Sequence, residues 1–179
     1  MAVLCPPLPQ NVDYWVDVEL GSDAFPGTST QPFKTLTRGV QAAASQNGPE
    51  SVFVVGRTCD ATGNTFFYSN DPGLSQPESF PLDLPSGTRV EGKNSGEGFP
   101  KIGIVGSGPA FRIFDSAGGH SDSSIEKLGI FGGDLAIRIQ GVGGDHVSTL
   151  LKKLTFSRNK TAVEVFARNG SLVEPTIQT

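Results

Sequence analysis

Apolar and polar residues alternate along short segments in the second half of the chain, and the alternation recurs at a fixed distance. Residues 101–114, 127–140 and 153–166 align without gaps at a spacing of 26 residues. Each copy contains two stretches in which every second residue is apolar, joined by a turn-forming stretch. A period of two predicts short β-strands with one buried face, and a unit of this length leaves no room for a crossover helix.

The apolar positions of this repeat are the expected core. They are Ile102, Ile104, Phe111 and Ile113 in the first copy, Leu128, Ile130, Ile137 and Ile139 in the second, and Leu154, Phe156, Val163 and Val165 in the third. Short strands that repeat in register bury such side chains only when coil stacks on coil. The pattern therefore predicts an all-β fold, a short right-handed parallel β-helix. An antiparallel sandwich is less favoured, because the Asn-Gly hairpin signals fall outside the internal turns.

The first half of the chain is predicted to close one end of the stack. Residues 35–45 place Leu36, Val40 and Ala43 on one helical face, with Thr35 as the N-cap, so we expect a short capping α-helix. A solenoid needs such a plug, because its end coil otherwise exposes apolar side chains and unpaired strand edges.

The remaining segments complete the predicted organisation. Residues 51–55 form a strand, 56–79 a long excursion, and 80–92 an irregular early coil with Leu82, Leu84 and Val90 inward. A chain of 179 residues fits one domain. We divide 1–179 into an N-terminal strand and capping helix (1–50), irregular first coils with a long loop (51–98) and regular coils (99–179).

A motif precedes the predicted helix. It consists of Gly21, Ser22, Asp23, Gly27, Thr28, Pro32, Phe33, Lys34 and Thr35. The motif resembles the opening of bacterial right-handed β-helix proteins of the pectate-lyase-like superfamily, where a strand leads into a capping helix. The resemblance extends over most of the chain and is specific for the fold. It says less about chemistry, since such openings occur in polysaccharide lyases, epimerases and many uncharacterised proteins.

The resemblance also allows one activity to be disfavoured. Paired-aspartate hydrolases of this fold carry Asn-Thr-Asp, Asp-Asp, Gly-His-Gly and Arg-Ile-Lys motifs on successive coils. Here Arg138 is followed by Ile and Gln140, His120 is followed by Ser121, and no Asp-Asp pair occurs. Calcium-dependent relatives leave calcium as a possible cofactor, but Asp23 is better explained as a turn-forming side chain than as a ligand, and we expect no cofactor.

Composition and charge limit the partners. A net charge of −4 and a pI near 5.1 lack the basic field that non-specific nucleic-acid binding needs. No apolar run approaches the length needed to cross a bilayer, so neither nucleic acid nor membrane is expected. Residues 1–10 lack a signal-peptide pattern, which leaves a cytoplasmic protein or a secreted one with its signal removed. Two free thiols at Cys5 and Cys59 are favoured over a disulfide, and no zinc motif occurs.

The two histidines are the most specific candidate for a catalytic or metal site. His120 and His146 lie 26 residues apart, one repeat, so they should stack on adjacent coils, with Asp122 and Asp145 nearby in sequence. The group is a candidate catalytic site, as a general acid/base pair, or a metal site. The favoured alternative is that both histidines are solvated in glycine-rich corner loops, and we expect no metal.

Recurring cations form the second candidate. Lys101, Lys127 and Lys153 recur on one arm of the repeat, and Arg112 and Arg138 recur on the other. They predict a face that binds an acidic polysaccharide. The favoured alternative is that these charges protect strand edges and keep the protein soluble, and that neighbouring carboxylates neutralise them.

Three functions follow from these features. The first is a non-catalytic β-helix that binds an acidic polysaccharide or a similar polymer. The second is a self-assembling structural module, and the third is a polysaccharide lyase-like enzyme centred on the histidines. The few coils favour binding or assembly over catalysis, because the groove of a polysaccharide enzyme usually spans more coils.

The C-terminal coil yields a testable expectation. Residues 171–179 continue the pattern as a partial coil without a recognisable cap. An uncapped solenoid end exposes apolar surface, so either the chain is an N-terminal fragment of a longer solenoid or a second copy covers this end through a two-fold contact. We predict a homo-oligomer formed through this open coil. Light scattering at micromolar concentration should report a dimer or a larger assembly, and a monomer would contradict the prediction.

Overall fold

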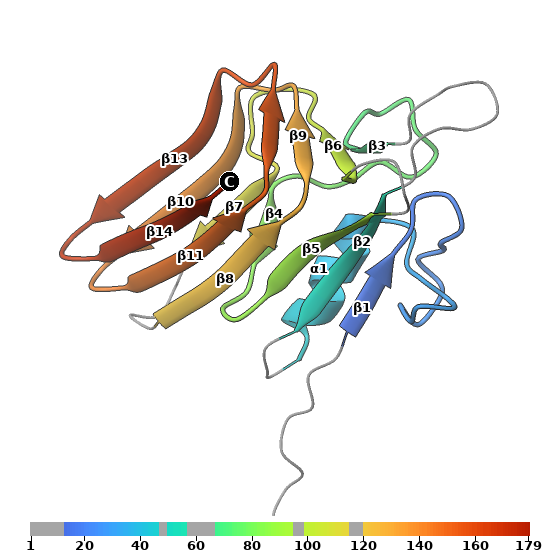
Figure 1. The fold of residues 1–179 in the computed structure, drawn as a ribbon, viewed down its shortest axis with the longest axis horizontal. Coiled ribbons are helices and arrows are strands. Elements are labelled where there is room, and N and C mark those ends of the chain that lie inside the picture. Colours follow the sequence, from blue (N-terminus) through green and yellow to red (C-terminus); the bar gives the residue numbers. More distant parts are fainter. Residues whose placement is uncertain (1–12, 47–49, 57–66, 95–98, 115–119) are drawn as a thin grey trace, which may run out of the picture.

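Three parallel sheets form the walls of the molecule (Figure 1), which is described by a computed structural model over residues 13–46, 50–56, 67–94, 99–114 and 120–179. Sheet A contains, in spatial order, β1 (Asp13–Val16), β2 (Ser51–Gly56), β5 (Arg89–Asn94), β8 (His120–Glu126), β11 (His146–Lys152) and β14 (Leu172–Gln178). Sheet B contains β3 (Phe67–Ser69), β6 (Lys101–Gly103), β9 (Gly129–Phe131) and β12 (Thr155–Ser157). Sheet C contains β4 (Leu82–Leu84), β7 (Phe111–Phe114), β10 (Leu135–Val142) and β13 (Thr161–Arg168).

Each regular coil gives one strand to each sheet in turn. The chain runs through β8, β9 and β10, and then through β11, β12 and β13 one coil further along. The Cα partners in these two coils are separated by the predicted repeat: His146 lies opposite His120, and Val163 opposite Ile137. The predicted fold class, an all-β parallel β-helix with one short helix near the N-terminus, is confirmed.

The register of the first predicted copy is corrected in one arm. Ile102 of β6 pairs with Ile130 rather than Leu128, and Lys101 pairs with Gly129 rather than lying level with Lys127. The turn that follows β6 is two residues longer than the turn that follows β9, so the gapless alignment fails there, while β7 and β10 keep the predicted register. A shift of two residues preserves which side chains face inward, because strand side chains alternate with a period of two.

Predicted inward side chains form the core in all but the last coil. The fully buried members include Ile102, Phe111, Ile113, Leu128, Ile130, Ile137 and Ile139, and Leu82, Leu84 and Val90 of the earlier coil are buried as predicted. In the last coil Leu154, Phe156 and Val163 are only partly buried, and Val165 is 46% exposed. The difference arises because no further coil packs on these side chains.

The predicted capping helix is confirmed as α1 (Leu36–Ala44). Thr35 is its N-cap, and its hydroxyl accepts a hydrogen bond from the Arg38 backbone N–H. Leu36, Val40 and Ala43 are buried, and the helix packs against β1, β2 and β4 at the N-terminal end of the stack (Figure 1).

The role predicted for Asp23 is too narrow. Its carboxylate accepts hydrogen bonds from the backbone N–H groups of Lys34 and Thr35 and from the Thr35 hydroxyl, 11 and 12 residues away in sequence. Asp23 therefore fastens the preceding loop to the start of α1, in addition to any local turn. The predicted excursion over 56–79 is also corrected, because β3 joins sheet B beside β6.

Cys5 and Cys59 lie outside the described residues, and the division into one domain stays a prediction. Among the described residues, no helix combines the length and the apolar character that crossing a bilayer requires.

The core assignment can be tested by truncating a side chain on β10. Ile137→Ala should lower the free energy of unfolding by about 2–5 kcal/mol, because Ile137 is fully buried between two neighbouring coils. Val142→Ala on the same strand should cost less than about 1 kcal/mol, because Val142 is 40% exposed. Denaturant unfolding measures both values, and equal losses would contradict the assignment.

Candidate functional site

One row of side chains crosses the whole outer face of sheet A. The row, which we call the sheet A ladder, consists of Trp15, Phe53, Glu91, Glu126, Lys152 and Gln178, each opposite the next on neighbouring strands. Adjacent strands of a sheet are about 4.8 Å apart, so the ladder has a regular spacing along the solenoid. Two aromatic rings therefore stand at one end of a track of charged and polar groups.

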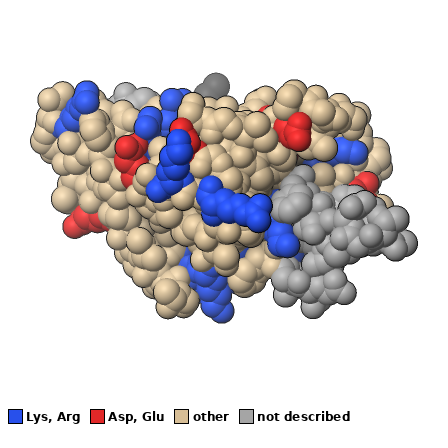
Figure 2. Space-filling model, turned by 90° about the horizontal axis from the view of Figure 1, so that it is seen from above, with Lys and Arg blue, Asp and Glu red and all other residues tan. Residues whose placement is uncertain are grey.

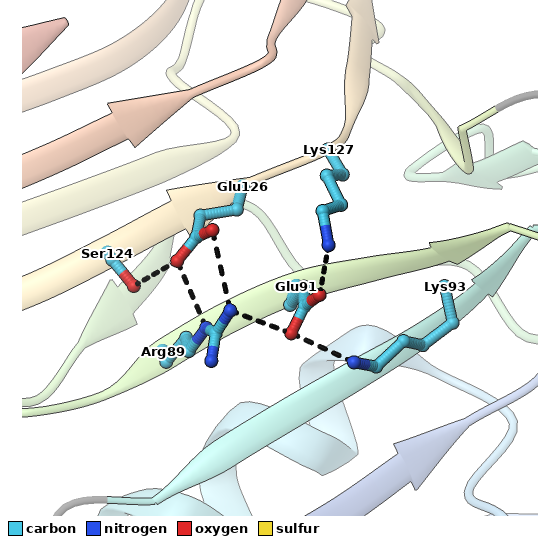
Figure 3. Close-up of polar contacts among 6 residues, drawn as sticks. All are labelled: Arg89, Glu91, Lys93, Ser124, Glu126 and Lys127. Atoms are coloured by element: carbon cyan, nitrogen blue, oxygen red, sulfur yellow. Dashed lines mark hydrogen bonds and ion pairs between the residues drawn. The ribbon is translucent and has the colours of Figure 1, made fainter. Parts of the chain in front are cut away.

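Cations surround the two carboxylates in the middle of this ladder (Figure 3). The Glu91 carboxylate forms ion pairs with Lys127 Nζ at 2.6 Å, Lys93 Nζ at 2.9 Å and Arg89 Nη2 at 2.9 Å. Arg89 also reaches Glu126, with Nε 3.0 Å from Oε1. These five residues, Arg89, Glu91, Lys93, Glu126 and Lys127, are called the sheet A cluster below.

Exposure within the sheet A cluster is unequal between the two signs of charge. The side chains of Glu91 and Glu126 are 4% and 8% exposed, whereas those of Arg89, Lys93 and Lys127 are 43%, 36% and 33% exposed. The carboxylates therefore lie beneath the cations and hold them in place. A molecule that approaches this face meets guanidinium and ammonium groups first.

Glu91 remains ionised in this setting. Burial by itself raises the pKa of its carboxyl group, but hydrogen bonds from Lys127 and Lys93 and the charge of Arg89 outweigh it. The net result is a pKa below the ordinary value of 4.5. The carboxylate thus carries its charge throughout the neutral range and has no proton to donate there.

A glycine allows Lys127 to reach Glu91. Lys127 turns the corner between β8 and β9 with a φ of 56°, a left-handed conformation that is uncommon for a residue with a side chain. Its carbonyl oxygen lies so close to Gly92 that a Cβ there would be 1.9 Å away. Gly92 thus lets the corner pack directly on β5, beside Glu91 of the same strand.

The aromatic end of the ladder joins the sheet A cluster through Lys93. The rings of Trp15 and Phe53 meet edge to face with centroids 5.0 Å apart, and Lys93 Nζ lies 4.0 Å from the centroid of Phe53. Such pairs stabilise neighbouring strands. They also leave two partly exposed aromatic rings on the outer face of the sheet.

The arginines predicted for polysaccharide binding lie on another face. Arg112 and Arg138 are opposite one another on the outer side of sheet C, as the repeat predicted. Arg112 is paired with Asp83, and Arg138 with Glu164, both at 2.6 Å. The carboxylates are 45% and 44% exposed against 40% for each arginine, so this surface presents both signs of charge equally.

The predicted lysine ladder is only partly formed. Lys127 and Lys153 occupy equivalent corners with φ of 56° and 51°, but Lys101 stands opposite Gly129 and is not in line with them. Figure 2 shows Lys and Arg side chains spread across one face of the molecule, with fewer acidic side chains between them. Polymer binding by Lys101, Lys127 and Lys153 stays a prediction.

The histidine prediction is met in backbone register alone. His146 and His120 are Cα partners, while the side chain of His120 lies outside the described part of the structure. His146 Nε2 is 2.9 Å from Glu174 Oε2 on β14, and Asp122 is exposed. Asp145 is buried and accepts a hydrogen bond from the Val142 backbone N–H. Their predicted catalytic role stays a prediction.

No cation site of the usual composition is present in the described ranges. Across those residues, no group of three or more His, Cys, Asp or Glu side chains is placed to hold a metal ion. The carboxylates of the sheet A cluster are paired with cations of the protein itself.

Arg89, Lys93 and the two aromatic residues were not among the candidates that the sequence pattern indicated. Residues 89–93 read Arg-Val-Glu-Gly-Lys, in which charged residues alternate with the buried Val90 and the close-packed Gly92. That alternation places three charges on one outer face and is the signal that could have found the cluster. The position of this strand beside Lys127 could not be deduced, because the early coils do not follow the 26-residue spacing.

Comparison with known proteins gives a family but no activity. A family model described as "Protein of unknown function (DUF1565)" matches residues 19–149. No curated protein and no solved structure matches the chain. The finer resemblance to pectate-lyase-like proteins stays a prediction.

The ionised state of Glu91 predicts a pH-dependent stability. Glu91→Gln should lower the free energy of unfolding at pH 7 by about 1–3 kcal/mol, because it removes hydrogen bonds to charged groups. The native pKa of Glu91 lies below its unfolded value, so this stabilisation is complete above pH 4.5 and is lost as the pH falls through the native pKa. The difference between variant and parent should therefore shrink in acid.

Glu164→Gln on sheet C is the matched control. It also breaks one carboxylate–arginine pair, but at an exposed position, so it should cost less than about 1 kcal/mol. Urea unfolding across pH 3 to 7 compares the two variants. Equal effects, or an effect of Glu91→Gln that does not change with pH, would refute the account of the cluster.

Proposed function

The chain belongs to the DUF1565 family of proteins of unknown function, and we propose that it is a non-catalytic β-solenoid that binds an acidic polysaccharide across the outer face of sheet A. The observation that supports this most strongly is the unequal exposure in the sheet A cluster. Three cations stand at the surface above two carboxylates that are nearly buried.

This arrangement favours an anionic ligand for an energetic reason. Flexible lysine and arginine side chains normally lose conformational entropy when they bind a ligand. Here Glu91 and Glu126 already hold Arg89, Lys93 and Lys127 in position. The ligand carboxylates would meet donors that are ordered in advance, and charge-assisted hydrogen bonds of this type are the stronger ones.

The ladder adds a reason to favour a polymer of sugar rings. Trp15 and Phe53 offer partly exposed aromatic rings, on which the C–H faces of a pyranose can stack. Lys152 and Gln178 continue the track across the two following strands. A polymer that lies along the solenoid would meet one strand about every 4.8 Å, close to the length of one sugar unit.

Binding is favoured over turnover by the ionised state of Glu91. General acid catalysis by a carboxyl group needs a pKa raised toward neutrality. The pKa of Glu91 is lowered, because the hydrogen bonds from Lys127 and Lys93 and the charge of Arg89 outweigh its burial. A lyase centred on His120 and His146 remains the less supported alternative, since in the described part of the chain only backbone register brings these two residues together.

Self-assembly through the open coil is a second candidate, supported by the exposed apolar side chains of the last coil. Ile177 and Leu172 of β14 are 66% and 51% exposed. Pro175 lies between them, at a position whose N–H would face the free edge of sheet A, because Leu172 donates toward β11 and donors alternate along a strand. Pro175 therefore could not donate a hydrogen bond to a strand added at this edge, and a second copy would cover the open coil by side-chain contacts rather than by a continuous sheet. Light scattering tests whether such an oligomer forms.

Two double variants test polysaccharide binding. Lys93→Gln with Lys127→Gln should weaken binding of polygalacturonate about tenfold or more, because about 1.4 kcal/mol of contact energy corresponds to a factor of ten. Arg112→Gln with Arg138→Gln removes the same number of cations from sheet C and should leave affinity within a factor of about two. Isothermal titration calorimetry measures both, with circular dichroism to confirm folding.

Ionic strength provides the second arm of this experiment. Binding at the sheet A cluster should weaken as salt is added, because partly exposed charges are screened. An uncharged polysaccharide such as dextran should bind no better than background. Equal losses in the two double variants, or no binding of polygalacturonate by the parent protein, would rule out the proposal.

A further inference from the structure

A separate pocket of about 490 Å³ lies between the start of α1, strand β3 and the loop that follows β3. Its apolar lining comes from Val18, Tyr68 and Leu74, and Lys34, Asp71 and Gln76 supply polar groups. Pockets that bind small molecules usually have volumes of about 300–1,000 Å³ and this mixture of apolar walls with few polar groups. The pocket shares no residue with the sheet A cluster.

The loop that forms one wall is fastened at both ends. The Asn70 side chain accepts from the Val105 N–H at 2.7 Å and donates to the Val105 carbonyl at 2.9 Å. At the other end the Glu78 N–H donates to the Ser69 carbonyl at 2.7 Å. The wall is therefore ordered before a ligand arrives, which lowers the entropy cost of binding.

Tyr68 lies beneath the lining of the pocket and holds the neighbouring backbone segments together. Its hydroxyl lies within hydrogen-bonding distance of the Val16 carbonyl at 3.1 Å, the Val55 carbonyl at 3.0 Å and the Val18 N–H at 3.2 Å. These contacts tie together the ends of β1 and β2. The hydroxyl is thus used by the fold, and the ring, which is 2% exposed, supports the lining of the pocket from beneath.

Charges in the pocket disfavour an anion. Glu78 accepts hydrogen bonds from the backbone N–H groups of Leu36 and Thr37, both at 2.7 Å, so its oxygens are already engaged at the start of α1. Asp71 adds a second carboxylate, against the single ammonium group of Lys34. Burial raises the pKa of Glu78, which weakens its charge, and Asp71 and Lys34 balance one another, so the pocket has no excess of cations that would attract an anion.

We propose that this pocket binds a neutral monosaccharide, with one face of the sugar against Val18 and Leu74 and its hydroxyl groups on Lys34, Asp71 and Gln76. A hexose fits the volume, and its hydroxyl groups both donate and accept, as this mixed set of partners requires. Its apolar C–H face can pack against Val18 and Leu74. The proposal does not depend on the function assigned to sheet A.

Glycine 103 offers a way to fill the pocket without removing a polar group. Gly103 lies at its edge, and a Cβ there would be 3.4 Å from the Ser69 hydroxyl, so a side chain can be accommodated. Gly103→Phe should place a ring in the space that the sugar would occupy. Gly108→Phe is the matched control, because a Cβ at Gly108 meets nothing within 4 Å and Gly108 does not line the pocket.

The experiment follows backbone amide signals of the full chain by NMR during titration with galactose and, separately, galacturonate. Galactose at millimolar concentration should shift the signals of Ser69, Asp71 and Gln76, and galacturonate should bind about tenfold more weakly. The galactose shifts should vanish in Gly103→Phe and persist in Gly108→Phe. Polygalacturonate binding should be unchanged in Gly103→Phe, which separates this proposal from the one for sheet A.

Several outcomes would overturn the proposal: no shift with galactose, equal or tighter binding of galacturonate, or shifts that survive in Gly103→Phe. If Gly103→Phe does not fold, Gln76→Ala replaces it, because Gln76 is exposed on the loop and its loss leaves the core intact. Galactose affinity should then fall about threefold or more, the loss of one hydrogen bond. An unchanged affinity in Gln76→Ala would contradict the proposal.

Discussion

Stacking of inward side chains from one coil onto the next is the interaction on which the rest of this structure depends. Val52, Val90, Ile125 and Leu151 stand opposite one another on four neighbouring strands of sheet A, and all are buried. Ile177 continues the same row on β14 and is 66% exposed, because none of the described residues stacks on its outer side. No coil has a core of its own, so burial is shared between neighbours and ends where the stack ends.

The two ends of the stack are therefore unequal. At the N-terminal end α1 covers the first coil, and its own start is secured by carboxylates from distant segments: Asp23 on Lys34 and Thr35, and Glu78 on Leu36 and Thr37. Free N–H groups at the start of a helix favour such anionic partners. At the other end the apolar side chains of β13 and β14 face solvent, and this contrast motivates the assembly candidate.

The same register that aligns the core also aligns the outer faces, and there the local distribution of charge separates two similar surfaces. Sheet C places Arg112 and Arg138 beside carboxylates that are as exposed as the arginines themselves, so its field largely cancels. Sheet A places Glu91 beneath its cations, so the more exposed groups of the sheet A cluster are positive although the whole chain has a net charge of −4. Local burial, rather than net charge, decides which face favours an anion.

The sequence by itself determined the strands, the faces of their side chains, the capping helix and the alignment of His120 with His146, because a period of two and a spacing of 26 residues are written in residue order. It placed Lys101 wrongly, since the length of one turn was hidden by a plausible gapless alignment. Only the tertiary structure brought Lys127 to Glu91, across coils of unequal length, and buried that carboxylate beneath three cations. Alternation fixes the direction of a side chain, but its partners depend on how much chain each coil consumes before it returns to the sheet.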